Sequence, residues 1–152
     1  MKNYLKKPIV KIGFIILLLI GISFLNFGIY ILYSNGLVNT YNVSNLQELK
    51  IAVADTAEKN IVFTSSFEIT ETINLQGVTN ISASDDITIS RNESFLDDMF
   101  NIQENANVTF SKTEDNVLTI DGNNVVSTGI AFRNNDNATL TLGAGLEIIN
   151  FK

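Results

Sequence analysis

The residues best suited to chemistry are two arginines and two pairs of adjacent aspartates. Arg91 and Arg133 are the only arginines of the chain, and the pairs are Asp85-Asp86 and Asp97-Asp98. A calcium site needs six to eight oxygen ligands that converge from several residues. Neighbouring residues on a strand point to opposite faces, so one pair supplies few ligands to one ion. We therefore interpret the pairs as solvated turn carboxylates and predict no metal, cofactor-binding or catalytic residue.

The composition removes other kinds of site. The chain has no cysteine and no histidine. It therefore lacks disulfides, thiolate metal ligands and the usual general base near neutral pH. Asp121-Gly122 indicates a tight turn in which the glycine takes a positive φ. Neither a helix nor a basic residue follows this turn, so it does not predict a phosphate site.

Asparagine is abundant and forms five Asn-x-Ser/Thr sequons. They begin at Asn42, Asn80, Asn92, Asn107 and Asn137. A chain rich in asparagine and threonine produces such sequons by chance, so we do not interpret them as glycosylation sites. We expect the asparagines to serve in turns with left-handed backbone, or in ladders between stacked strands.

The charges divide the chain into two parts. Four lysines precede Ser34, whereas the first acidic residue is Glu48. After Ser34 there are 16 acidic and six basic residues, which gives this part a net charge of −10. Such an acidic part is repelled by phosphates, so nucleic-acid binding is excluded.

The basic start is followed by an uncharged apolar run, Ile12–Tyr33. As a helix it would span roughly 33 Å, enough for a hydrocarbon core of about 30 Å. Residues 1–34 therefore predict a signal peptide or an uncleaved signal-anchor transmembrane helix. The length of the run favours the anchor, with the lysines in the cytoplasm and the C-terminal part outside. Cleavage near Gly36 would instead give a secreted or cell-wall protein.

A short polar linker is expected over residues 35–42, followed by a helix from Asn45 to about Glu58. Ser44 and Gln47 have the spacing of a capping box. An apolar helical face recurs with a period of 3.6 residues. It contains Leu46, Leu49, Val53 and, further along, Ala57.

From Asn60 onward, short apolar-alternating runs separated by Asn, Asp, Gly and Ser predict strands and turns without a second helix. The expected strands are 61–64, 67–70, 72–75, 80–82, 87–90, 99–102, 107–110, 117–120, 129–132, 139–142 and 146–151. Their alternating apolar residues should form the core: Ile87, Ile89, Val108, Phe110, Leu118, Ile120, Leu140 and Leu142.

This strand-rich part is similar to itself. Residues 104–110 recur as 136–142 and residues 99–100 as 131–132, at an offset of 32; residues 87–90 recur as 118–121 at an offset of 31. A unit of about 30 residues with two or three short strands is typical of a solenoid coil. An amphipathic helix directly before the first coil would cover its open end.

The stretch VSNLQELKIAVADTAEKNIVFTSSFEITETINL, followed by ITIS and LTIDGNN, resembles a known family. It is similar to the opening of the pectate-lyase-like adhesive domains of Gram-positive surface proteins. There an "LxxAl" cap helix precedes "iv", "titi" and "ltIdG" strands. The resemblance covers roughly Val43 to Lys152 and implies a capped right-handed parallel β-helix at the cell surface.

The chain departs from that family in having neither a wall-sorting motif nor a terminal cap. We therefore expect residues 43–152 to be an incomplete β-helix of about three coils, with apolar core and strand edges open at its C-terminal end.

The function expected from these features is that of a non-catalytic, adhesin-like or stalk module. Its expected partners are the membrane, through Ile12–Tyr33, and surface glycans or host or cell-wall proteins. The alternative is the N-terminal part of a secreted polysaccharide lyase or hydrolase whose catalytic coils are absent. Lyases of β-helix fold use an arginine base and a carboxylate-bound calcium, which the two arginines and the aspartate pairs would have to supply. A third hypothesis is an inactive truncated remnant.

Overall fold

The computed structural model describes residues 38–111 and 115–152, which form a mainly-β unit with one short helix. This composition of elements agrees with the sequence prediction. The predicted signal or membrane segment, Ile12–Tyr33, and the cleavage site near Gly36 lie outside the described residues. Within the described residues, no helix is long and apolar enough to cross a membrane.

Twelve strands and the helix α2 (Leu46–Ala54) succeed one another along the described chain. The strands are β1 (Asn39–Val43), β2 (Lys59–Phe63), β3 (Phe67–Ile69), β4 (Ile73–Leu75), β5 (Val78–Ala83), β6 (Ile87–Arg91), β7 (Phe100–Ile102), β8 (Asn107–Phe110), β9 (Leu118–Asp121), β10 (Phe132–Asn134), β11 (Thr139–Leu142) and β12 (Leu146–Ile149). Each of the eleven predicted strands overlaps an observed one, although β10 begins three residues later than expected.

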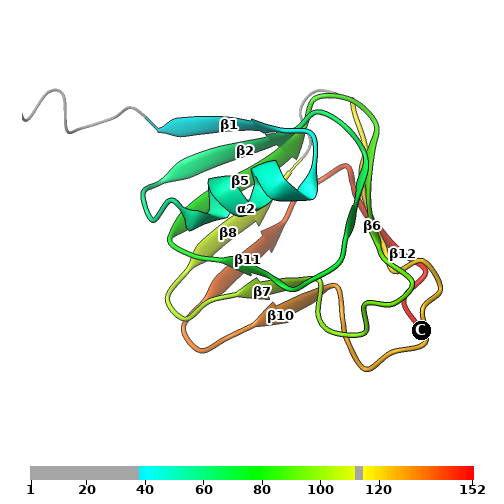
Figure 1. The fold of residues 1–152 in the computed structure, drawn as a ribbon. Coiled ribbons are helices and arrows are strands. Elements are labelled where there is room, and N and C mark those ends of the chain that lie inside the picture. Colours follow the sequence, from blue (N-terminus) through cyan, green and yellow to red (C-terminus); the bar gives the residue numbers. More distant parts are fainter. Residues whose placement is uncertain (1–37, 112–114) are drawn as a thin grey trace, which may run out of the picture. The chain divides into compact units, whose positions relative to one another are not determined.

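The strands pair in parallel and form three sheets. A five-stranded sheet has the order β1-β2-β5-β8-β11, a four-stranded sheet β12-β9-β6-β3 and a three-stranded sheet β10-β7-β4. From β2 onward the chain enters the five-, four- and three-stranded sheets in constant rotation, and we call each such passage a circuit. Figure 1 shows the five-stranded sheet descending from β1 to β11.

The internal repeats mark the strand register. Thr139–Leu142 pairs with Asn107–Phe110, and Phe132 pairs with Phe100, as the offset of 32 predicts. The pairing of Ile87 with Leu118 matches the offset of 31. Lys59 pairs with Thr79, only 20 residues further on. The first circuit is therefore shorter than the later ones.

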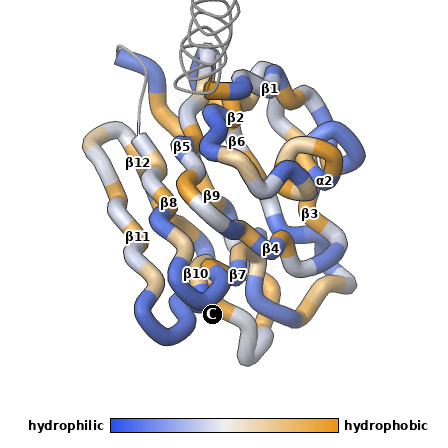
Figure 2. Tube along the Cα trace, turned by 90° about the vertical axis from the view of Figure 1, so that its left-hand side faces the viewer, coloured by the Kyte–Doolittle hydropathy of each residue, from blue (hydrophilic) through white to orange (hydrophobic). Residues whose placement is uncertain are grey.

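The core lies between the three sheets. Buried and partly exposed residues alternate strictly along β2 and β6. Figure 2 shows apolar and polar stretches interspersed along the described chain. Among the predicted core residues, six are buried: Ile87, Ile89, Val108, Phe110, Leu118 and Ile120. Leu140 is only partly buried and Leu142 is 48% exposed. The core prediction is wrong for Leu142, because β11 lies at the edge of its sheet.

The N-terminal cap of α2 lies one residue later than predicted. Asn45 is the N-cap, and its side chain accepts a hydrogen bond of 2.9 Å from the backbone N–H of Glu48. The Glu48 carboxylate reaches back to the backbone N–H and the hydroxyl of Ser44. The predicted Ser44–Gln47 pair is therefore wrong, because Glu48 rather than Gln47 occupies the third helical position.

The helix ends at Ala54 rather than near Glu58. The next residue, Asp55, has extended backbone and its carboxylate accepts a hydrogen bond from the N–H of Ala57. Ala57 is therefore exposed and lies outside the helix, contrary to the prediction. Leu49 is fully buried, and α2 contacts β1, β3 and β4. Because β3 and β4 are edge strands of their sheets, α2 covers that side of the stack.

The predicted linker contains part of a strand. Asn39–Val43 forms β1, which pairs in parallel with Lys59–Phe63. The linker assignment is therefore wrong for residues 39–42. On the face that bears Val43, this strand carries Asn39 and Tyr41, which donate hydrogen bonds to Asp55. The apolar half of the alternation by which strands are recognised is therefore missing.

Asparagines occupy the left-handed backbone positions that were expected of them. Non-glycine residues with positive φ are Asn105, Asn123, Asn124, Asn137 and Asn150. In the 121–124 turn, Asn123 and Asn124 have φ of 54° and 55°, whereas Gly122 does not have positive φ. The predicted reason for Gly122 is therefore wrong. A Cβ there would lie 2.6 Å from the carbonyl oxygen of Asn150, so close backbone approach requires the glycine.

Candidate functional site

Arg91 ends β6 and points into the molecule. It is 1% exposed. Its guanidinium donates hydrogen bonds to the hydroxyl of Ser127 and to the carbonyl of Gly129, the latter at 3.1 Å. The guanidinium carbon also lies 5.9 Å from the ring centre of Phe95 and 5.0 Å from that of Phe151. Desolvation lowers the pKa of Arg91 from its ordinary value. Arg91 thus fastens the loop between β9 and β10 to the four-stranded sheet.

Asp98 lies beside this loop and is engaged on both carboxylate oxygens. One oxygen accepts the backbone N–H of Ile130 at 3.0 Å, and the other pairs with the Arg133 side chain. Burial by itself raises the pKa of Asp98, but the hydrogen bonds from Arg133 and Ile130 outweigh it and leave the pKa below its ordinary value. The structure therefore brings together Arg91, Asp98 and Arg133 among the residues first considered for chemistry.

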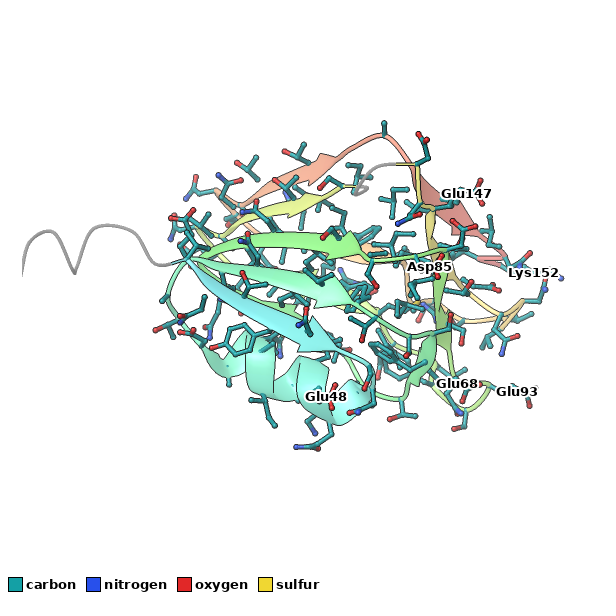
Figure 3. The ribbon with its side chains drawn as sticks, turned by 90° about the horizontal axis from the view of Figure 1, so that it is seen from above. Glu48, Glu68, Asp85, Glu93, Glu147 and Lys152 are labelled. Atoms are coloured by element: carbon teal, nitrogen blue, oxygen red, sulfur yellow. The ribbon has the colours of Figure 1, made fainter. Side chains whose placement is uncertain are left out.

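The other aspartates do not join this cluster. Asp97 is exposed, and the Asp85-Asp86 pair lies in the turn between β5 and β6. There Asp86 accepts the backbone N–H of Val117 at 2.9 Å, and Asp85 accepts that of Asp86. Figure 3 shows Glu48, Asp85 and Glu147 at separate places on the surface. In the part of the chain that the structure describes, no three acidic, histidine or cysteine residues gather as a metal site.

A row of primary amides crosses the outer face of the three-stranded sheet. Asn74, Asn101 and Arg133 are in register on β4, β7 and β10. Asn101 donates to the side-chain oxygen of Asn74 at 3.0 Å, and Asn135 donates to that of Asn101 at 2.8 Å. Gln103 also donates to Asn74, at 2.9 Å. We call Asn74, Gln103, Asn101 and Asn135 the amide row. It confirms the expectation of asparagine ladders, as does the Asn80–Asn60 bond in the five-stranded sheet.

A groove of about 360 Å³ lies between α2 and the Asn74–Gln103 end of the amide row. Six of its nine lining residues have polar side chains and three are apolar, and apolar atoms make up the larger share of its surface. It is lined by Lys50, Val53, Ala54, Glu71, Thr72, Ile73, Asn74, Gln76 and Gln103. Lys50 and Glu71 form an ion pair of 2.8 Å, and both side chains are about half exposed. The charges of the groove therefore compensate each other, and the neutral amides remain.

The sequence contained an unnoticed signal for this groove. The segment Ile73-Asn74-Leu75-Gln76 recurs as Phe100-Asn101-Ile102-Gln103. The offset of this repeat is 27, which is the register of β4 with β7. The repeats at offsets of 31 and 32 belong to later circuits, and the repeat at offset 27 does not coincide with them. Lys50 could not have been found in this way, because the fold alone brings α2 beside β4.

A second polar cluster joins β1 to the end of α2. The carboxylate of Asp55 accepts hydrogen bonds from the hydroxyl of Tyr41 at 2.7 Å and from the amide of Asn39 at 2.8 Å. With the backbone N–H of Ala57 as the largest contribution, these bonds lower the pKa of Asp55 to about 2. Lys59 is fully buried beneath it and donates to the carbonyl of Ala57 at 3.1 Å. This cluster joins β1 and the end of α2 to Lys59, the residue at which β2 and the first circuit begin.

Comparison with known proteins gives no relative. No protein-family model, no curated protein and no solved structure matches the chain. The site is therefore interpreted from its own geometry.

Proposed function

We propose that residues 38–152 form coils of a right-handed parallel β-helix, which acts outside the cell as a non-catalytic, adhesin-like or stalk module. The observation that carries this proposal is the rotation of the chain through three parallel sheets, with α2 against their edge strands. Parallel crossover connections are right-handed in almost all proteins, which gives the handedness. Solenoids of this kind use extended surfaces rather than pockets for binding.

The outward face of the five-stranded sheet suits such a role. Its strands place Asn60, Asn80, Thr109 and Thr141 in one register row. These side chains are short and uncharged, although the acidic part of the chain carries a net charge of −10. A flat face without charge can approach another surface with little desolvation of ions.

The state of the two arginines supports a module without catalysis. A lyase base must contact its substrate, but Arg91 is buried and hydrogen-bonded to Ser127 and Gly129. Arg133 is held by Asp98. Both side chains thus hold loops in place.

The proposed location follows from the basic start and the apolar run Ile12–Tyr33, which would anchor the chain with residues 38–152 outside. The chain contains no cysteine, so single cysteines can report its topology. Thr56→Cys, at an exposed position, should react with a membrane-impermeant maleimide in intact cells. Asn3→Cys should react only after lysis. Labelling of Asn3→Cys in intact cells, with Thr56→Cys protected, would refute the proposed location.

The role itself is tested by attachment. Cells that display the full chain should adhere to glycan- or matrix-coated surfaces better than cells that display residues 1–42 alone. The same cells should release no unsaturated sugars from polygalacturonate. Release of such products, which absorb short-wavelength ultraviolet light through their conjugated double bond, together with unchanged attachment would favour the lyase hypothesis instead.

A further inference from the structure

We propose that the groove between α2 and β4 binds a neutral saccharide, which continues along the amide row. This inference rests on the proposed surface role and gives it a ligand class. Its starting point is the juxtaposition of a concave groove with a ladder of amides from three successive circuits. Ligand pockets have volumes from roughly 300 Å³ upward. A groove of about 360 Å³ therefore has room for a short part of an oligosaccharide.

The amides of the groove are oriented but not saturated. The side-chain oxygen of Asn74 accepts from both Asn101 and Gln103, which fixes the direction of its amide group. Among the described residues, no hydrogen bond reaches the Nδ2 of Asn74 or the Oε1 of Gln103. The Oε1 of Gln76 is likewise without a partner there, while its amide nitrogen donates to the carbonyl of Val53. One donor and two acceptors therefore remain available to a ligand.

Fixed donors and acceptors of this kind match hydroxyl groups. Each sugar hydroxyl donates and accepts at once, as do Ser and Thr hydroxyls. Side chains that are held in place before binding lose little entropy when they bind. The Lys50–Glu71 pair at the rim satisfies its own charges, so the groove has no net charge that would select an ionic ligand.

Two other ligand classes fit less well. An acidic polysaccharide would be repelled by a part of the chain with net charge −10. An extended peptide gains most of its affinity by adding a strand to a free sheet edge. At this groove the edge is that of β4, and α2 lies against it. The groove offers apolar wall atoms together with free amide groups, and this combination suits a sugar, which carries C–H groups as well as hydroxyls.

Saturation-transfer NMR of the ligand tests the proposal with the full 152-residue chain in lipid nanodiscs. The probes are cellohexaose, maltohexaose and chitohexaose, with a galacturonate hexamer and a neutral Gly/Ser hexapeptide as contrasts. Polar contacts alone give dissociation constants on the order of millimolar, a range in which this method works. At least one neutral saccharide should receive saturation, and the two contrasts should not.

Asn74→Leu should reduce that transfer at least five-fold, because it removes one free donor and releases Gln103. Gln103→Leu, which removes a different groove amide, should act in the same direction. The matched control is Asn92→Leu, which breaks a comparable amide bond of 2.9 Å to Glu68 beside the four-stranded sheet and should leave the transfer unchanged. The urea midpoint of each variant shows whether it is folded.

The groove assignment is overturned if no neutral saccharide receives saturation, if the acid or the peptide alone does so, or if Asn92→Leu reduces transfer as much as Asn74→Leu. These outcomes are separate from the cysteine-labelling test of location. A chain that is labelled outside the cell but receives no saccharide keeps its proposed location and loses this ligand.

Discussion

Replacing Arg91 with methionine should leave the protein nearly as stable as before, although the side chain is fully buried. The guanidinium donates to Ser127, Gly129 and, at 3.4 Å, Ile130. Its Nε is buried without a partner. The hydrogen bonds of Arg91 stabilise the folded protein, whereas its buried and incompletely hydrogen-bonded charge destabilises it. The net change in the free energy of unfolding depends on whether the acceptors keep other partners when the guanidinium is removed.

Each acceptor retains a partner when the guanidinium is removed. The carbonyl of Ile130 still accepts the N–H of Met99 at 3.0 Å, and the carbonyl of Gly129 still accepts the hydroxyl of Ser127 at 3.4 Å. The penalty of about 1–3 kcal/mol for a stranded buried acceptor therefore does not arise. The lost charge-assisted bonds, about 1.5–3 kcal/mol each, are opposed by several kcal/mol of recovered desolvation. We expect Arg91→Met to change the free energy of unfolding by at most about 1 kcal/mol, because methionine also fills most of the volume.

Arg91→Ala should behave differently. It removes the same hydrogen bonds and also the packing against the rings of Phe95 and Phe151. Truncation of a large buried side chain to alanine costs about 2–5 kcal/mol, because the cavity collapses only in part. The difference between the two variants thus measures packing, and the methionine variant alone measures the polar balance.

Urea unfolding of the full chain in detergent micelles, followed by far-ultraviolet circular dichroism, gives both free energies. Arg133→Met is the control, since the Arg133 side chain is half exposed. Its partner Asp98 is mostly buried but keeps the N–H of Ile130, so the loss of the pair should cost about 1 kcal/mol. If Arg91→Met cost as much as Arg91→Ala, the hydrogen bonds of Arg91 would contribute more than its packing, contrary to the expected near-balance of its polar terms. An intact Arg91→Met protein would also allow attachment to be measured without that guanidinium.

Three further changes test other parts of the molecule by the same unfolding assay. Leu49→Ala empties a fully buried position under α2 and should cost about 2–5 kcal/mol; a cost under 1 kcal/mol would mean that the helix does not support the core. Asp55 has a folded pKa of about 2, below its ordinary 3.8, so its stabilising effect is present above pH 4 and is lost as the pH falls towards 2. Asp55→Asn should therefore lose less stability than the wild type between pH 5 and pH 2.5, and parallel pH profiles would contradict this. Gly129→Ala would place a Cβ 2.3 Å from the carbonyl of Asp97 and should cost about 1–3 kcal/mol; an unchanged midpoint would show that the loop can shift freely.

Much of the strand arrangement was predictable because each circuit repeats its neighbour. The pairing of residues 107–110 with 139–142 follows from the sequence repeat alone. Local chemistry was less predictable. Whether Ser44 or Asn45 caps α2 depends on a shift of one residue, which the spacing of polar side chains does not settle. The tight approach of Gly122 to Asn150 depends on two turns from different circuits.

The groove was not predictable as a site, because its parts have no common sequence pattern. Asn74 and Gln103 could be linked by their repeated motif, but the motif says nothing about concavity. Concavity arises because α2 follows β1 before the first circuit, where the chain has no strands in the three- and four-stranded sheets. A hollow between a helix and a strand of different segments arises only when the fold is assembled. Sequence patterns, which report one element at a time, cannot show it.

The short first circuit and the longer later circuits present different surfaces: a groove beside β4 in the first, and long loops in the later ones. The extra residues of the later circuits lie partly in the loops between β6 and β7 and between β9 and β10. These loops are held by Arg91 and by the Asp98–Arg133 pair. In the first circuit, by contrast, the corresponding connection is only residues 70–72. This short turn leaves the outward side chain of Asn74 on β4 accessible at the groove, while α2 contacts the strand edge. Charged groups are therefore used to fix the long loops, and the neutral amides face the groove. This division of chemistry is the reason to seek a ligand at the short circuit and a structural role at the arginines.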